Sequence, residues 1–167
     1  MDIINYALIL ILSFLGTFIG IILSNIAIEE ITHVKKYATY ANILLVSLII
    51  LLSIYSINKI YAIILAIISL VVSILSKNKC DNKWTYAAMG ALLYISTINK
   101  EILYVTILII IYGASSVTID ATKHFKNKIN GQIKSSENTK LITKTLSKYS
   151  WYLLVGIIFY ITFTYIL

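Results

Sequence analysis

Residues 38–76 are almost entirely apolar: they read ATYANILLVSLIILLSIYSINKIYAIILAIISLVVSILS and carry one charge, Lys59. A single helix of this length would be almost twice as long as the hydrocarbon core of a bilayer, which is about 30 Å thick. It would also leave the lysine near the bilayer centre, at a cost of roughly 2.5–3.5 kcal/mol. Asn58 and Lys59 are therefore predicted to form the turn of a helical hairpin, with membrane spans at 38–57 and 60–76.

Uncharged runs on either side of this hairpin predict four further spans. They cover residues 3–28, 84–99, 102–120 and 149–167. Each approaches the roughly 20 residues that a membrane-crossing helix needs, and the run 84–99 is the shortest. We therefore expect one all-α transmembrane domain, residues 1–167, with six membrane helices. No basic segment precedes the first span and no small-residue cleavage site follows it, so we expect it to be kept as a membrane helix.

The composition of the chain also favours a membrane protein. Of the 167 residues, 59% are hydrophobic and 13% are charged, and the mean hydropathy is +0.89. Soluble domains carry about twice this charged fraction. A soluble enzyme, a disordered tail and a nucleic-acid-binding protein are therefore excluded, and we expect no nucleic-acid partner. The chain contains no proline, which usually kinks helices, and no arginine, which binds phosphate bidentately.

The lysines are distributed unevenly between the two ends of the predicted helices. The loops after the first, third and fifth spans hold 12 of the 14 lysines. By the positive-inside rule these loops are cytoplasmic, so both termini are expected outside. We expect a multi-pass protein in the plasma membrane of a prokaryote.

The predicted cytoplasmic loop 121–148 is the only long polar segment. Its apolar residues and lysines recur every four residues, which predicts two short amphipathic helices lying along the membrane surface before the last span. We expect Lys140, Lys144 and Lys148 to bind anionic lipid headgroups, at about 1 kcal/mol for each lysine. A solvated basic loop and a basic docking face for a protein partner are the alternatives.

Small and aromatic residues indicate how the helices are held. Gly16 and Gly20 form a GxxxG pattern, which lets two membrane helices approach closely. We expect these glycines to pack inside the bundle, with a homodimer through the first span as the alternative. Tyrosines near the span ends, among them Tyr86, Tyr149 and Tyr152, are predicted to anchor the helices in the headgroup region.

Polar residues inside the spans are few and mostly uncharged. Asn42 and Thr106 are predicted to form hydrogen bonds between helices. Proton and ion relays usually need carboxylates or histidines within the membrane, so this pattern disfavours an ion-coupled pump.

Carboxylates and histidines gather at the cytoplasmic ends of two predicted spans. Glu29, Glu30 and His33 follow the first span, and Asp120 and His124 follow the fifth. Spacings of three and four residues place each group on one helix face. Facing carboxylate and imidazole groups form metal sites in helix bundles, so Glu30, His33, Asp120 and His124 are candidate zinc or iron ligands. The alternative is that the acids pair with nearby lysines and the histidines are solvated; no other cofactor is expected.

Two short runs around Glu29 resemble known families. Ala27-Ile28-Glu29-Glu30-Ile31, followed by Lys36-Tyr37, resembles a run in uncharacterised small multi-pass membrane proteins of archaea, a likeness that implies no function. Asn25-Ile26-Ala27-Ile28-Glu29 is similar to a run in small prokaryotic diacylglycerol and undecaprenol kinases, which implies an acidic residue near a metal–nucleotide. This chain departs from those kinases in having six predicted spans, and Thr32-His33 where a further aspartate is expected.

Three functions fit the sequence. We expect a non-catalytic integral membrane protein, a subunit or scaffold that packs in the lipid bilayer with itself or with another membrane protein. The first alternative is a transporter or channel for small solutes or lipids. The second alternative is a membrane enzyme acting on lipid headgroups through candidate catalytic residues at the cytoplasmic face: Glu29, Glu30, His33, Asp120 and His124.

Overall fold

The computed structural model describes residues 2–26, 28–55, 57–75, 82–98, 101–126 and 135–166, without the side chains of 25, 28–34, 82–83, 122–126, 135–141 and 165–166. The described chain is helical throughout apart from short turns. Its helices are α1 (Ile3–Ile26), α2 (Ile28–Tyr55), α3 (Lys59–Leu75), α4 (Asn82–Ile98), α5 (Ile102–Lys126), α6 (Ser135–Tyr149) and α7 (Trp151–Ile166).

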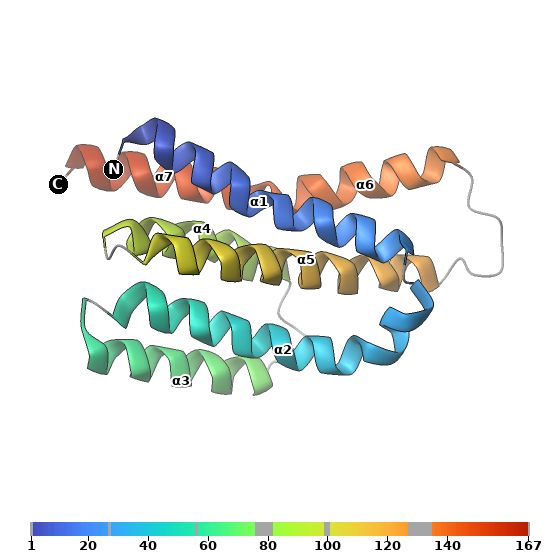
Figure 1. Cartoon of the computed structure of the whole chain (residues 1–167), viewed down its shortest axis with the longest axis horizontal. Helices are drawn as coiled ribbons and strands as arrows, with labels where there is room; N and C mark the ends of the chain where they lie inside the picture. The colour runs from blue at the N-terminus through green and yellow to red at the C-terminus, as the bar shows by residue number, and fades with distance from the viewer. Residues whose placement is uncertain are drawn as a thin grey trace.

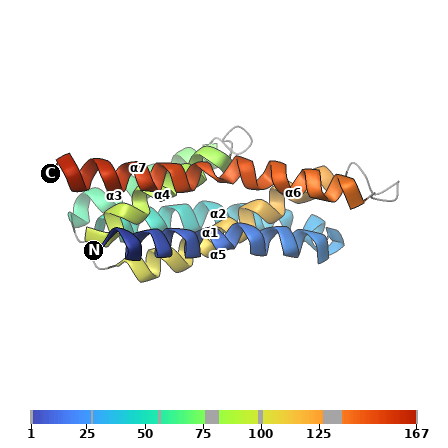
Figure 2. The ribbon, with the colours of Figure 1, turned by 90° about the horizontal axis from the view of Figure 1, so that it is seen from above.

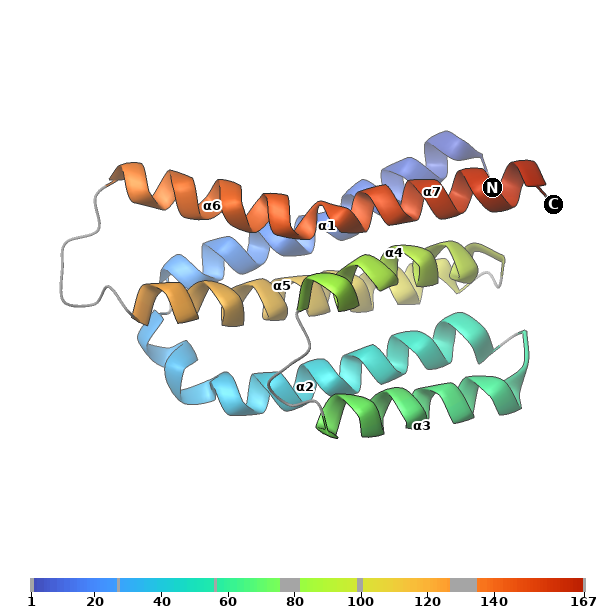
Figure 3. The same ribbon diagram turned by 180° about the vertical axis from the view of Figure 1, so that it is seen from behind.

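The helices form three layers that share one long axis (Figure 1). The middle layer is α4 and α5, which lie between α1 with α7 on one side and α2 with α3 on the other (Figure 3). Successive helices from α1 to α5 alternate in direction, and α6 and α7 lie end to end in one direction (Figure 2). Both termini are therefore at the same end of the bundle.

Four described segments are long and apolar enough to cross a membrane. They are Ile3–Ser24, Lys35–Tyr55, Ile102–Ala121 and Ile142–Thr164. The helix α3 is equally apolar but has 17 residues, and the less apolar α4 also has 17. The prediction of an all-α fold is thus confirmed, with four helical segments long and apolar enough to cross a membrane.

Two helices extend beyond their predicted ends into charged sequence. We expected residues 29–37 to be a loop, but α2 already begins at Ile28. We expected the fifth span to end at residue 120, but α5 continues to Lys126. Glutamate and lysine are good helix formers, and no proline interrupts either region, so the helices continue into the polar sequence.

The polar segment 121–148 therefore differs from its predicted form. Its beginning is the end of α5, residues 127–134 lie outside the described residues, and its last part is α6. As expected, α6 is amphipathic and precedes the last apolar helix. It does not cross the bundle axis, as a helix lying flat on the membrane would, but extends α7 along that axis (Figure 2).

The turn between α2 and α3 lies at the predicted hairpin. Ile57 N and Asn58 N both donate to Ile54 O, at 3.0 and 3.1 Å, and close the end of α2. The side-chain Oδ1 of Asn58 then accepts from the first amides of α3, Ile60 N at 3.0 Å and Tyr61 N at 3.3 Å. These amides have no partner within their own helix, so Asn58 is an N-cap.

We expect Asn58→Ala to lower the free energy of unfolding by about 1 kcal/mol, because the first amides of α3 lose their acceptor. Asn58→Asp is the matched control, since aspartate caps equally well and should leave the stability within about 0.5 kcal/mol. Unfolding by SDS in mixed micelles measures both. Equal losses for the two variants would contradict the capping role.

Candidate functional site

The candidate acidic and histidine residues lie on two helices of the bundle. Glu29, Glu30 and His33 are in the first turns of α2, not at the end of α1, and Asp120 and His124 are in α5. The two helices pack against each other. The side chain of Asp120 is the only one of the five within the described part of the structure.

Asp120 contacts residues far along the chain. Its Oδ2 accepts a hydrogen bond from Lys148 Nζ at 2.7 Å and another from Tyr149 OH at 2.9 Å. The aspartate side chain is 14% exposed and the lysine 33%, while the tyrosine is fully buried. The carboxylate therefore joins α5 to the junction of α6 and α7.

The contact between Asp120 and Lys148 concerns two predicted roles, lipid binding by Lys148 and metal binding by Asp120. Lys148 was expected to bind a lipid headgroup, but its ammonium is paired with Asp120. Lys144 is exposed on α6 and can reach headgroups, and the side chain of Lys140 lies outside the described residues. Among the side chains that the structure describes, no three histidine, cysteine, aspartate or glutamate residues lie close enough to hold a metal. The metal site and the headgroup contacts stay predictions.

The junction of α6 and α7 is a break of one residue, Ser150, made without proline or glycine. Ser150 N still donates to Leu146 O at 2.9 Å, and Leu153 N donates to Ser150 O at 3.0 Å. The hydroxyl of Ser150 donates to Ser147 O at 2.8 Å. Because Lys148 and Tyr149 directly precede this break, their contacts with Asp120 tie the end of α6 to α5.

The tyrosines expected in the headgroup region are instead in the core. Tyr86, Tyr149 and Tyr152 are each 0% exposed. The ring of Tyr86 lies 4.7 Å from that of Tyr152 and 5.3 Å from that of Tyr149, centroid to centroid. Tryptophans occupy the outside of the same helices: Trp84 is 64% and Trp151 50% exposed. The anchoring prediction is therefore wrong for these three tyrosines.

A glycine on α4 allows close backbone contact with α7 beside the buried rings. Gly90 of α4 faces α7, where a Cβ would lie 2.5 Å from Tyr152 O and 2.9 Å from Gly156 N. The hydroxyl of Tyr6 reaches into this contact and donates to Gly156 O at 3.1 Å. The ring of Tyr6 stacks on Tyr160 at 4.8 Å. Close glycine contact and tyrosine packing thus join α1, α4 and α7, a cluster that the sequence pattern did not reveal.

Gly16 and Gly20 lie on the face of α1 that packs on α5. A Cβ on Gly20 would lie 2.5 Å from Ala114 O and 2.8 Å from Val117 Cβ, and a Cβ on Gly16 would collide with the backbone of Ile110. This face of α1 is therefore covered by a helix of the same chain, which leaves no room there for a second copy.

Uncharged polar side chains link the helices around α5. Asn42 Nδ2 of α2 donates to Ser116 Oγ at 3.2 Å, and Thr118 Oγ1 lies 3.0 Å from Gly20 O of α1. Ser13 Oγ and Tyr152 OH are 2.5 Å apart between α1 and α7. Thr106, expected to bond across helices, donates to Ile102 O of its own helix at 2.6 Å.

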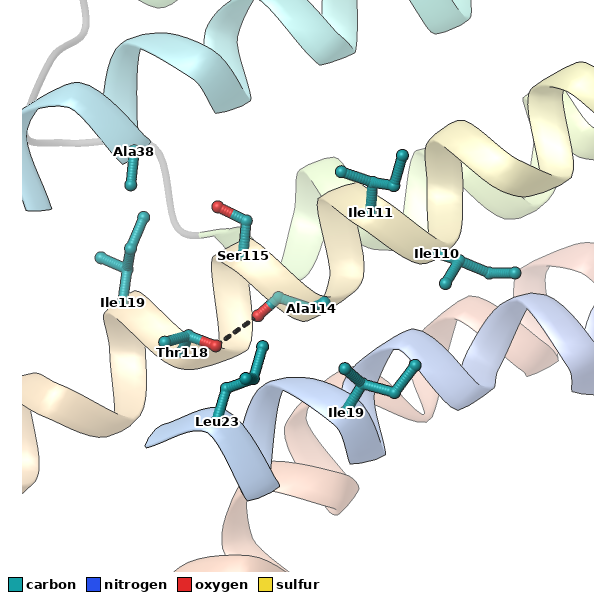
Figure 4. Close-up of a pocket in the computed structure, with 9 residues that line it drawn as sticks. All are labelled: Ile19, Leu23, Ala38, Ile110, Ile111, Ala114, Ser115, Thr118 and Ile119. Atoms are coloured by element: carbon teal, nitrogen blue, oxygen red, sulfur yellow. Dashed lines mark hydrogen bonds between the residues drawn. The ribbon is translucent and has the colours of Figure 1, made fainter. Parts of the chain in front are cut away.

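A groove of about 450 Å³ lies on the outer side of α5, between α1 and α2 (Figure 4). Residues of α5 between Ile110 and Ile119 form its floor. Ile19 and Leu23 of α1 form one wall, and Ala38 of α2 lies across from them. The lining is aliphatic except for the hydroxyls of two α5 residues, Ser115 and Thr118.

Comparison with protein-family models, with curated proteins and with solved structures gives no match for this chain.

Proposed function

We propose that this chain is a non-catalytic integral membrane protein that acts as a subunit or scaffold of a membrane complex. The observation that carries the proposal is the position of α3. This helix lies at the outside of the third layer and packs mainly on α2 (Figure 3). Its buried residues are Ala62 and Ala66, and most of its larger apolar side chains are exposed: Ile60, Ile63, Ile64, Leu65, Ile67, Ile68, Val71, Val72, Ile74 and Leu75.

The helix α3 packs closely on α2 through the small side chains of Ala62 and Ala66, and its other sides are open. In lipid, helices associate through close van der Waals packing and hydrogen bonds, because lipid tails are as apolar as leucine. The α2–α3 contact supplies such packing on one side of α3 only. A membrane helix of another protein, or of a second copy of this chain, would supply it on the other side.

We further propose that all six passes along the bundle axis cross the bilayer, in the plasma membrane of a prokaryote. Three features support six crossings. The helices α3 and α4 run alongside the four longer apolar segments. Successive passes alternate in direction, and both termini lie at one end of the bundle (Figure 1). Of the 14 lysines, 12 fall between the first and second, the third and fourth, or the fifth and sixth predicted spans, which supports placing the opposite end in the cytoplasm.

This orientation predicts a labelling pattern for single cysteines. The chain has one cysteine, Cys80, in the segment between α3 and α4. In intact cells we expect a membrane-impermeant maleimide to leave Cys80 unlabelled until the cells are lysed. The variant Cys80→Ser/Ile57→Cys, with its thiol in the α2–α3 turn, should be labelled in intact cells. The opposite pattern would invert the orientation, and labelling of both thiols from outside would reduce the number of spans.

The subunit role is tested by native mass spectrometry of the protein extracted gently from its own membrane. We expect a complex with a stoichiometric partner chain or a second copy. Ile67→Trp on α3 should dissociate it, whereas Ile158→Trp on α7 should not, although both isoleucines are 58% exposed. A lone chain that shows turnover or solute flux would overturn the proposal in favour of an enzyme or a transporter.

A further inference from the structure

The groove between α1 and α2 is open to its surroundings. Ile19, Leu23 and Ile111 at its edge are each between 44% and 47% exposed. Thr118 and Ile119 deeper on the floor are buried. A volume of about 450 Å³ falls within the range of roughly 300–1,000 Å³ that is usual for sites of small ligands.

The position of the groove sets the chemistry of its occupant. Its lining falls within three of the apolar segments, Ile3–Ser24, Lys35–Tyr55 and Ile102–Ala121. On each segment the lining residues lie toward the lysine-rich end of the bundle. In the proposed orientation the groove faces lipid tails at the depth of the cytoplasmic leaflet, and its aliphatic lining favours an apolar occupant.

The size of the groove favours a hydrocarbon chain over a protein helix. A helix with its side chains is roughly 10 Å across, so a volume of about 450 Å³ would hold only about one turn of it. A single hydrocarbon chain is much thinner and can extend along the floor formed by α5. The connection between α1 and α2 also brings the two walls together at one end (Figure 1).

One lysine lies beside the groove at its polar end. Lys35 precedes Ala38 by three residues and therefore shares its face of α2, one turn closer to the lysine-rich end of the bundle. Lys35 is half-buried, whereas Lys36, two residues before Ala38, lies on another side of α2 and is exposed. The nearest described carboxylate, Asp120, is paired with Lys148. Glu29 and Glu30 lie in the first turn of α2, six and five residues before Lys35. Lys35 therefore places a positive charge beside the groove.

We propose that this groove binds one hydrocarbon chain of an anionic phospholipid from the cytoplasmic leaflet, with the phosphate held by Lys35. The aliphatic floor on α5 contacts the chain. The ammonium group of Lys35 attracts the headgroup and strengthens binding about fivefold. The leaflet rests on the proposed orientation, but the site does not depend on the subunit role, since a monomer would hold the lipid equally well.

The test uses the full-length protein reconstituted with phosphatidylglycerol or phosphatidylcholine and examined by native mass spectrometry. We expect one phosphatidylglycerol to be retained per chain, and phosphatidylcholine to be retained about fivefold less. Lys35→Gln should lower phosphatidylglycerol retention about fivefold. Lys59→Gln, at the opposite end of the bundle, is the matched control and should leave it unchanged. Equal retention of both lipids would overturn the headgroup assignment.

The hydrocarbon chain is tested separately. Ala38→Phe and Ser115→Leu each place a larger side chain in the groove and should lower retention at least fivefold, while Ile64→Phe on α3 should not. A wild-type measurement keeps the test independent of variant folding: phosphatidylglycerol with a diazirine in one acyl chain should cross-link to α1 near Ile19 or to α5 between Ile110 and Ile119. Cross-links confined to other helices, or groove variants that fold and retain the lipid, would overturn the site.

Discussion

Gly16→Ala is expected to destabilise the bundle by about 2 kcal/mol, and Gly16→Leu to prevent α1 from docking at all. Alanine is the better helix former by up to about 1 kcal/mol, so helix propensity alone predicts a gain in stability. The added Cβ, however, would collide with backbone atoms of Ile110 in α5, which cannot rotate away as a side chain can. Overpacking of this kind usually costs about 1–3 kcal/mol.

The collision would separate two of the most closely packed helices. The α1–α5 contact also includes Gly20, whose Cβ would lie 2.5 Å from Ala114 O, and the hydroxyl of Thr118 close to Gly20 O. Moving α1 outward therefore loses several contacts together. Circular dichroism, gel filtration and unfolding by SDS in mixed micelles measure the effect.

Ala88→Leu is the control for this substitution. Ala88 is exposed on α4, so the larger side chain projects outward and should change the stability by no more than about 0.5 kcal/mol. If Gly16→Ala raised the stability, as propensity alone predicts, the close approach of α1 and α5 would be contradicted.

Features that depend on neighbouring residues could be predicted from the sequence. The alternation of apolar runs and charges predicts where helices lie, because a membrane helix must be apolar over a fixed length. The GxxxG pattern of Gly16 and Gly20 marks a face for close packing, because residues four apart lie on one side of a helix. The helix ends at Ile28 and Lys126 were missed, since glutamate and lysine permit helix as readily as loop.

Features that depend on packing between distant segments could not be predicted. A tyrosine near the end of a span can face either the headgroups or the core, so its position along the span did not predict the burial of Tyr86 and Tyr152. One signal was available: Tyr86 and Gly90 are four residues apart, as are Tyr152 and Gly156, which pairs a large with a small residue on each of two helices. That pattern is typical of two faces that interdigitate.

The ion pair between Asp120 and Lys148 also depends on packing between distant segments and could not be predicted from the sequence. Lys148 is 28 residues away and on another helix, while other lysines lie nearer in the sequence. The interpretation of Asp120 as a metal ligand rested on His124 four residues later, a purely local spacing. Only the arrangement of α5 beside the α6–α7 junction brings the carboxylate to Lys148 and Tyr149.

Asp120→Ala is expected to lower the free energy of unfolding by about 2 kcal/mol and to loosen α6 more than the rest of the bundle. The variant removes the acceptor of Tyr149 OH, a fully buried hydroxyl, and an unsatisfied buried donor costs about 1–3 kcal/mol. Lys148 is a third exposed and can turn its ammonium to water, so its share of the loss is smaller. Lys144→Met, at an exposed lysine of α6, is the control and should change the stability by less than about 0.5 kcal/mol.

The buried tyrosine and the carboxylate can be separated by a double-mutant cycle. Tyr149→Phe removes the hydroxyl together with its need for a partner, so Asp120→Ala should cost about 1 kcal/mol less in the Tyr149→Phe background than in the wild type. Hydrogen exchange followed by mass spectrometry should show faster exchange in α6 for Asp120→Ala, with α1 and α4 unchanged. Asp120, Lys148 and Tyr149 meet at the break between α6 and α7. If exchange rose uniformly across all helices, or if the two substitutions were strictly additive in the cycle, this contact would not set the position of α6.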